Sequence, residues 1–297
     1  MNNSLKAAII SGLVAGFVLG IAVEFFDQIA ASIGLFEPWW RPINTGNIII
    51  NIPIFSIWGI ILGIIFSKAY SIIPKEGVLK GLVYGLFLWL IISVRAVCFN
   101  LAYGYSLLAT GHIFVGFFYY LLFGLVLGIL YDELVKSGQY LNKEKKIETY
   151  DVRSGILPGA IAGLLGGFAA GITAVLGTAT GAYYIVNAPE RLTFDFFLSQ
   201  GGAHAFVNMI WSIFFGMIFA KVYNLVPSRN VKKGILFSLI LYFIYDFHLG
   251  TFCIIWAIYH NALLIVKFLA YGMFVIGIAQ AIVFGLVLGL LYRKPPK

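Results

Sequence analysis

Long apolar segments alternate with short polar ones along the whole chain. Eight segments consist almost entirely of apolar residues, at about 5–29, 48–69, 77–99, 112–133, 154–177, 200–222, 232–253 and 268–292. A helix needs about 20 such residues to cross the hydrocarbon core of a bilayer. The runs are continuous and do not alternate with polar residues, which favours helices over the strands of a membrane barrel. The pattern predicts an all-α polytopic membrane protein with about eight transmembrane helices.

The two halves of the chain carry the same pattern. Residues 57–74, IWGIILGIIFSKAYSIIP, align without a gap with residues 210–227, IWSIFFGMIFAKVYNLVP, 153 positions later. Residues 11–20 match 154–163 at a spacing of 143, and residues 123–131 match 284–292 at a spacing of 161. We therefore predict two four-helix repeats, residues 1–135 and 154–297, joined by a linker at 136–153. Because four is an even number, both repeats enter the membrane in the same direction and are parallel.

Composition supports a membrane protein. Hydrophobic residues make up 61% of the chain and charged residues 11%, whereas a soluble protein has about 25% charged residues. The basic residues lie in short loops between apolar segments, so no nucleic-acid partner is predicted. All but four of the 20 Lys and Arg residues lie at one set of helix ends, the exceptions being Arg41, Arg95, Arg191 and Lys267. By the positive-inside rule, both termini and the linker are predicted to be cytoplasmic, in a protein of the cell membrane.

Two segments leave the helix count open. Residues 31–47 and 254–267 are long enough to hold an interfacial, re-entrant or additional helix, and one more span would change the predicted orientation. Cys98 and Cys253 lie near corresponding ends of matched helices. Free buried thiols are favoured there over a disulfide.

Glycines four residues apart predict close helix packing. Gly12, Gly16 and Gly20 share one helix face, and the same spacing recurs at residues 155, 159 and 163. Without side chains on that face, two helix backbones can approach closely.

Polar residues within the spans gather in the predicted outer half of the bilayer. The candidates for a substrate or ion path are Glu24, Asn47, Asn51, Arg95, Gln200, His204, Asn208, Asp246 and His248. Such residues are costly in lipid and mark functional faces. The preferred ion pair joins Arg95 to Glu24. Residues 200, 204 and 208 form one stripe along a helix.

Two interpretations of these residues remain open. They form structural contacts, such as interhelical hydrogen bonds, or they line an outward-facing vestibule between the repeats, with Glu24 or Asp246 as a proton or cation site. For Asp27, close to the surface, the structural interpretation is preferred. His204, Asp246 and His248 are metal-ligand types, but positions 246 and 248 point about 200° apart on a helix, so neither a metal nor a cofactor is predicted.

The function favoured by these features is a small secondary transporter or channel-like protein. The alternatives are a non-transporting scaffold or a subunit of a larger membrane complex, and an intramembrane enzyme acting on lipid. The chain lacks the H-E-x-x-H, G-x-S-x-G and P-loop patterns, so an enzyme is not favoured. The expected partners are membrane lipids, a small solute or proton, and further copies of this chain or other membrane proteins.

Overall fold

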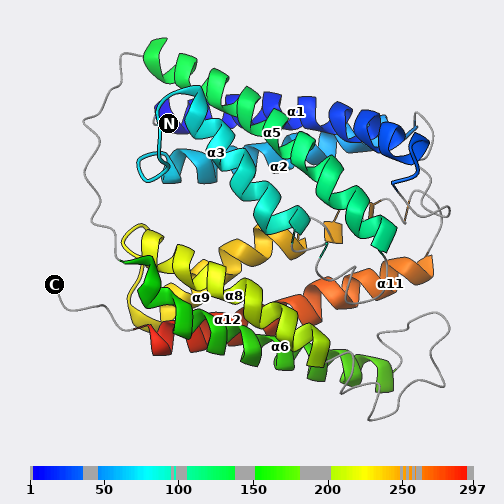
Figure 1. The fold of residues 1–297 in the computed structure, drawn as a ribbon, viewed down its shortest axis with the longest axis vertical. Helices are drawn as coiled ribbons and strands as arrows, with labels where there is room; N and C mark the ends of the chain where they lie inside the picture. Colours follow the sequence, from blue (N-terminus) through cyan, green and yellow to red (C-terminus); the bar gives the residue numbers. More distant parts are fainter. Residues whose placement is uncertain are drawn as a thin grey trace. The chain divides into compact units, whose positions relative to one another are not determined.

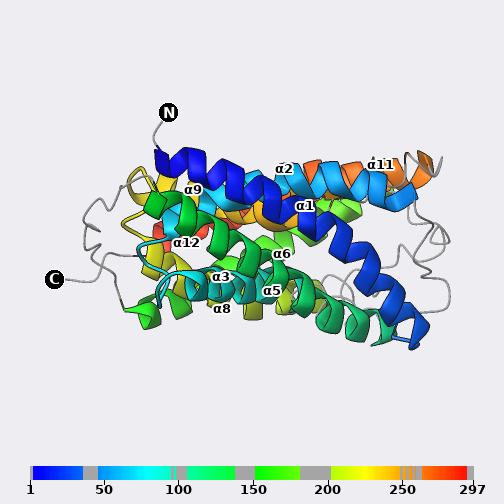
Figure 2. The ribbon, with the colours of Figure 1, turned by 90° about the horizontal axis from the view of Figure 1, so that it is seen from above.

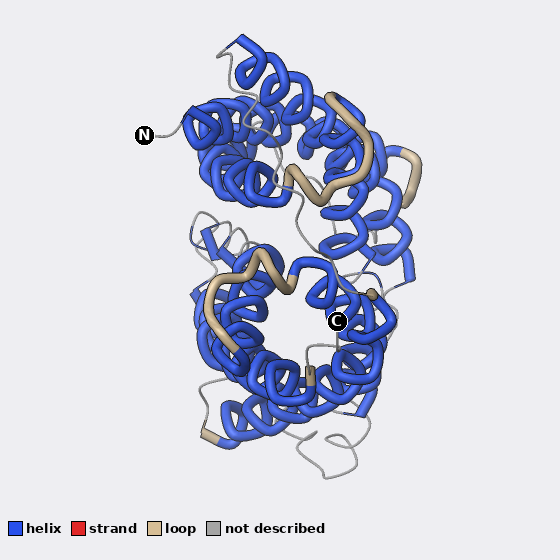
Figure 3. Tube along the Cα trace, turned by 90° about the vertical axis from the view of Figure 1, so that its left-hand side faces the viewer, coloured by secondary structure: helices blue, strands red, loops and turns tan. Residues whose placement is uncertain are grey.

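The computed structural model describes residues 3–35, 46–94, 97, 106–137, 151–180, 202–247, 250–251, 254–255, 258 and 263–292. Throughout these ranges the backbone forms helices and loops only (Figure 3). The chain divides into two compact units, Met1–Ile147 and Glu148–Lys297, and each is described by itself. Most of the predicted linker, residues 138–150, lies outside the described ranges.

Among the described residues, six helices are long and apolar enough to cross a membrane, at Ser4–Ser32, Ile48–Ala69, Thr110–Lys136, Val152–Gly177, Ala205–Val222 and Leu269–Leu291. A further apolar helix, Val78–Val94, is shorter. Large apolar side chains on one face of the first helix, such as Leu13, Phe17 and Phe25, are exposed, as expected for a surface that meets lipid. The chain is therefore an all-α, membrane-embedded protein. The count of eight spans in two repeats remains a prediction.

The described part of the first unit contains four long helical segments. They are α1 (Asn3–Ser32), α2 (Gly46–Ala69), α3 (Val78–Trp89), which continues as the π-helical η1 (Leu90–Val94), and α5 (Ser106–Ser137). Helix α1 packs on α2 and α5, and α3 packs on α5 (Figures 1 and 2).

The second unit begins with the 3₁₀ turn η2 (Val152–Gly155) and the helix α6 (Ile156–Ala179). Helix α8 (Gly202–Val222) and helix α9 (Asn230–Tyr242) follow, and α9 continues as the π-helical η4 (Phe243–Phe247). The last helical stretch comprises α11 (Leu263–Tyr271), the π-helical η5 (Gly272–Gly277) and α12 (Ile278–Leu291). It begins five residues before the predicted span, so part of the ambiguous 254–267 segment belongs to this helix. Helix α6 packs on α8 and α12, and α9 packs on α12.

Glycine contacts hold neighbouring helices together in antiparallel pairs. A Cβ atom added to Gly59 of α2 would lie 2.7 Å from the Cα of Gly16 in α1. In the second unit, a Cβ atom added to Gly216 of α8 would lie 2.7 Å from the Cα of Gly159 in α6. The backbones therefore touch where the side chain is a hydrogen atom.

A lysine–tyrosine contact fixes one end of each unit, which we call the lysine end. Lys80 donates a hydrogen bond of 2.9 Å to the carbonyl oxygen of Tyr70, and its Nζ lies 4.0 Å from the centre of the same ring. In the second unit, Lys233 makes the corresponding contacts with Tyr223, at 2.6 and 4.1 Å. The lysine and the tyrosine of the second unit each lie 153 positions after their counterparts in the first unit. A lysine ammonium over an aromatic face is attracted by the ring quadrupole.

The loop before each of these lysines has the same unusual backbone. Lys75 and Gly77 have φ of 80° and 53°, and Ser228 and Asn230, again 153 positions later, have φ of 96° and 48°. Positive φ at Lys and Ser is uncommon. The two units therefore share a loop conformation as well as a side-chain contact.

Candidate functional site

Helix α1 carries two carboxylates near its end, and they lie in the first unit away from the lysine end. Glu24 is 4% exposed and accepts a 3.1 Å hydrogen bond from the Gln28 amide. Asp27 accepts a hydrogen bond from the Tyr119 hydroxyl of α5. Glu24 and Asp27 lie three residues apart in α1, which is nearly one helical turn. Glu24 lies about 27 Å along the helix from Lys6, at about 1.5 Å per residue, a distance close to the thickness of a hydrocarbon core of about 30 Å.

Asn51 of α2 lies beside this part of α1. A Cβ atom added to Gly20 would lie 2.8 Å from the Cα of Ile52 and 3.0 Å from the carbonyl carbon of Asn51, which places the two backbones in contact. Asn51 is 4% exposed.

The second unit has a neutral amide pair at its core. Gln280 of α12 donates a 2.7 Å hydrogen bond from Nε2 to Oδ1 of Asn208 in α8, and Asn208 is 2% exposed. Helix α6 faces the pair with glycines, since a Cβ atom at Gly167 would lie 3.3 Å from the Cβ of Asn208 and one at Gly166 would lie 3.6 Å from the Cγ of Gln280. This arrangement fits an interhelical hydrogen bond in a tightly packed interface.

Asp246 lies in a π-helical turn. The third helix of each unit changes from α to π at matched positions, Leu90–Val94 and Phe243–Phe247, and Ser93 corresponds to Asp246. Asp246 is half-buried and close enough to Tyr242 to interact electrostatically. The Tyr242 hydroxyl donates a 2.9 Å hydrogen bond to the carbonyl oxygen of Met273 in η5, so two π-helical turns meet there. Such turns are frequent at functional sites.

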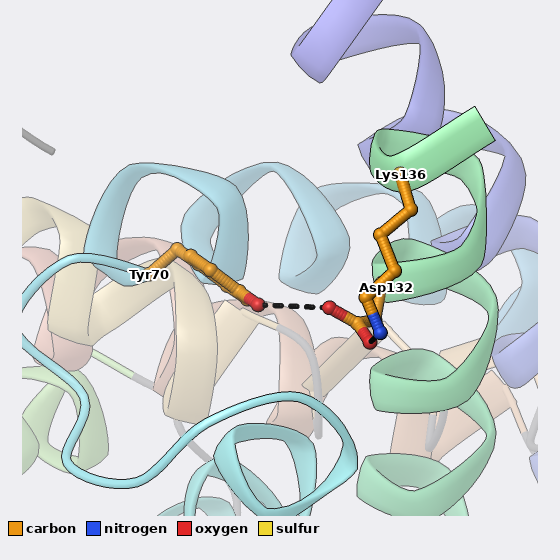
Figure 4. A network of polar contacts seen from close by, with 3 residues as sticks. All are labelled: Tyr70, Asp132 and Lys136. Atoms are coloured by element: carbon orange, nitrogen blue, oxygen red, sulfur yellow. Dashed lines mark hydrogen bonds and ion pairs between the residues drawn. The ribbon is translucent and has the colours of Figure 1, made fainter. Parts of the chain in front are cut away.

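The carboxylate of Asp132 has partners that account for its charge. Asp132 of α5 accepts a 3.4 Å hydrogen bond from the Tyr70 hydroxyl and pairs with Lys136 at 2.5 Å (Figure 4). The network lies at the lysine end of the first unit. Its charges are balanced, so we assign it a structural role.

The structure brings together only part of the predicted path. Glu24 and Asn51 lie on adjacent helices of the first unit, while Asn208 and Asp246 belong to the second unit. Asn47 and His204 lie in α2 and α8, with side chains outside the described set. Arg95, Gln200 and His248 lie outside the described residues, as do Cys98 and Cys253. The ion pair between Arg95 and Glu24, and the vestibule between the repeats, remain predictions.

Two polar partners were missed by the sequence analysis, Tyr119 and Gln280. Each bonds a polar residue on another helix of its unit, and the two lie 161 residues apart, the spacing of the repeat between α5 and α12. A polar side chain at the same repeat position in both halves was the signal that could have identified them.

No group of three or more His, Cys, Asp or Glu side chains that could hold a metal ion occurs among the described residues. Comparison with protein-family models, with curated proteins and with solved structures finds no match for this chain.

Proposed function

We propose that this protein is a secondary transporter or channel-like protein of the membrane, with Glu24 as the site of a coupling or permeating cation or proton. The proposal is based on the burial of the Glu24 carboxylate and on the neutral character of its hydrogen-bond partner. Glu24 lies in an apolar span, is 4% exposed, and has no cationic partner in the described part of the chain. Its one hydrogen-bond donor there is the neutral Gln28 amide.

This burial is significant because removing a charged group from water costs free energy. An isolated carboxylate removed from water is strongly destabilised, and in practice it takes up a proton or pairs with a positive charge. Asp27 is a second carboxyl group, three residues further along α1. The two side chains therefore favour occupancy by a proton or cation, and ionisable residues that persist in a span are associated with ion and substrate pathways.

Comparison between the units supports a role beyond packing. By the sequence spacings of 143 and 161, Glu24, Asp27 and Tyr119 correspond to Gly167, Ala170 and Gln280. The second unit fills this position with glycine contacts and a neutral amide bond. Helix packing at this place therefore needs no charge, so the carboxylates of the first unit call for another explanation.

We also propose that the two units are parallel repeats with both termini in the cytoplasm. The lysine–tyrosine contacts and loop conformations, matched 153 residues apart, support the repeat. The excess of basic residues at the lysine end supports the orientation. In this orientation the α1 carboxylates face the outer side, where an external ion can reach them.

A scaffold or complex subunit is the second candidate. It is favoured by the glycine contacts and by the Asn208–Gln280 bond, which stabilise helix pairs without providing a route for a solute. This role predicts that Glu24 affects stability only.

Reconstitution into vesicles tests the choice. Ion entry would be followed with a pH dye and with radioactive sodium under imposed proton or sodium gradients. We expect protein-dependent flux that Glu24→Gln abolishes and that Asp132→Asn, a carboxylate change in the balanced network at the lysine end, preserves. Folded protein that gives the same flux as empty vesicles under both gradients would favour the scaffold.

A further inference from the structure

We propose that a basic surface at the lysine end of the second unit binds the headgroups of anionic phospholipids. The surface consists of exposed cations from the turn η2, the end of helix α8 and the start of helix α9, namely Arg153, Lys221, Arg229 and Lys232. We call these four residues the basic cluster. The inference goes beyond the proposed function, because a lipid can bind here whether the protein transports an ion or acts as a scaffold.

Contacts within the second unit bring these three segments to the same end. The hydroxyl oxygens of Ser154 in η2 and Tyr292 share a hydrogen bond of 3.1 Å. The ring centres of Tyr292 and Tyr223 lie 5.1 Å apart, and the carbonyl oxygen of Tyr223 accepts the hydrogen bond from Lys233. Each cation of the basic cluster lies within four residues of one of these side chains in sequence. The cluster therefore occupies one end of the helix bundle of this unit.

This end of the unit coincides with the ends of two membrane spans. The apolar stretch of α8 ends at Val222, one residue after Lys221, and the apolar stretch that includes α6 begins at Val152, one residue before Arg153. A span of about 20 residues ends where the hydrocarbon core meets the headgroups. Lysine and arginine side chains at this boundary extend their charges toward the headgroups, so the phosphates of lipids lie within their reach.

The charge of these segments is almost entirely positive. Residues 151–155 and 221–233 contain five cations and one carboxylate, Asp151. The Asp151 carboxylate accepts a 3.0 Å hydrogen bond from the backbone nitrogen of Arg153. The fifth cation, Lys233, is buried against the ring of Tyr223 and does not belong to the surface. A group of about four or more Lys and Arg residues next to a transmembrane helix attracts anionic lipids.

The matched loop of the first unit has the same backbone conformation and different charges. The positive φ angles of the two loops occur at matched positions. At the repeat spacing of 153, however, Arg229 corresponds to Glu76 and Lys232 corresponds to Leu79, and all four side chains are exposed. The loop therefore forms without either cation, so folding does not account for them.

Arg229 and Lys232 also lie where positive charge is unfavourable. Arg229 is the N-cap residue of α9, and the first turn of this helix contains no acidic residue. The N-terminus of a helix carries a partial positive charge, which favours anionic side chains over cations. Side chains at the N-cap and at the third helical position lie close enough to interact, so the two cations also repel each other. An anion bound by both side chains would offset these costs.

The side chains of the basic cluster suit a phosphate. A guanidinium group can donate two parallel hydrogen bonds to phosphate oxygens, and a lysine ammonium group binds phosphate as a point charge. A phospholipid is favoured over a soluble phosphate or an acidic protein segment because the cluster lies at the level where lipid phosphates are already concentrated.

Equilibrium binding of radiolabelled phosphatidylglycerol to the full-length protein in detergent micelles tests this surface, with phosphatidylcholine as the zwitterionic control. We expect saturable binding of phosphatidylglycerol that weakens as the salt concentration rises, because salt screens exposed charges. The double variant Arg229→Glu, Lys232→Leu gives the second loop the residues that the first loop carries in the same conformation. Each Lys or Arg near an anionic lipid surface contributes about fivefold in affinity, so this variant should bind at least about 25-fold more weakly.

Two variants of the first unit provide matched controls. Lys75→Gln removes one exposed cation beside Glu76 and should leave the affinity close to that of the wild type. The reciprocal double variant, Glu76→Arg with Leu79→Lys, should increase the amount of phosphatidylglycerol bound at saturation. Circular dichroism and gel filtration verify that each variant is folded.

Three results would overturn the proposal. The first is equal affinity of the wild type for the anionic and the zwitterionic lipid. The second is wild-type affinity in the folded Arg229→Glu, Lys232→Leu variant, which would leave these cations with a role in membrane orientation only. The third is displacement of the lipid by inorganic phosphate at concentrations similar to that of the lipid, which would assign the surface to a soluble phosphate compound.

Discussion

The contact between α1 and α2 predicts that Gly59→Ala destabilises the first unit. In a helix, alanine is ordinarily favoured over glycine by about 1 kcal/mol. Here the added methyl group meets backbone atoms that cannot rotate away, 2.7 Å from the Cα and 2.9 Å from the nitrogen of Gly16. The carbonyl oxygen of Gly12 is closer still.

The size of the effect follows from these distances. Carbon atoms pack at about 3.5–4.0 Å, so the helices must separate by about 1 Å at this point. Overpacking costs about 1–3 kcal/mol, and a gap of this width forfeits a quarter to a half of the dispersion energy of the contacts around it. Subtracting the gain in helix propensity of about 1 kcal/mol leaves a net destabilisation of up to about 2 kcal/mol.

Equilibrium unfolding in mixed micelles of a mild detergent and SDS, followed by circular dichroism, measures the change. Gly202→Ala is the matched control, because a Cβ atom at Gly202 meets nothing within 4 Å. We expect Gly202→Ala to be neutral or stabilising by up to about 1 kcal/mol. If Gly59→Ala proved as stable as Gly202→Ala, the close approach of α1 and α2 would be refuted.

Three further predictions concern single contacts and use the same unfolding assay. Tyr84→Phe removes the 2.9 Å hydrogen bond to the Leu62 carbonyl oxygen and should cost about 0.5–1.5 kcal/mol; a neutral change would show that the hydroxyl contributes nothing. Lys233→Met should cost about 1–2 kcal/mol by removing both the carbonyl bond and the contact with the tyrosine ring, whereas wild-type stability would contradict a structural role for the lysine. Gln280→Leu should cost about 0.6–1.7 kcal/mol, the range for hydrogen bonds between membrane helices, and a stability equal to wild type would mean that its bond to Asn208 is energetically neutral.

The spans that the sequence predicts and the structure bears out are those with the strongest apolar signal. The helices around Leu13, Trp58 and Phe123 consist of continuous apolar runs, and hydropathy alone locates them because every backbone polar group in lipid must be bonded within its own helix. Helix ends were less predictable. Helix α5 continues to Ser137, inside the predicted linker, and α11 begins at Leu263, because a polar boundary in sequence does not fix where helical hydrogen bonding stops.

The candidate site was only partly predictable, and the reason is that its contacts join distant residues. Glu24 and Asn51 stand out as polar residues in apolar runs. The bond from Tyr119 to Asp27 links residues far apart in sequence, and tyrosine is common enough in membrane helices to give no local signal. The π-helical turn that holds Asp246 was also missed, since a change from four-residue to five-residue backbone bonding has no simple sequence signature.

The likeness and the difference between the units bear on where the function resides. At the lysine end, each unit repeats the same loop conformation and the same lysine–tyrosine contact, and the lysine and tyrosine of each contact are partners inside their own unit. A role in stabilising the fold is therefore sufficient to explain these polar residues. At the other end, the matched positions differ in charge, with Glu24 and Asp27 in one unit and Gly167 and Ala170 in the other. Two buried or half-buried carboxylates lower stability unless something neutralises them, whereas the glycine and alanine at the same place pack at no such cost. A feature that one unit does without, and that the other retains at an energetic cost, is better explained by a ligand than by folding, which is why the α1 carboxylates are the first residues to test.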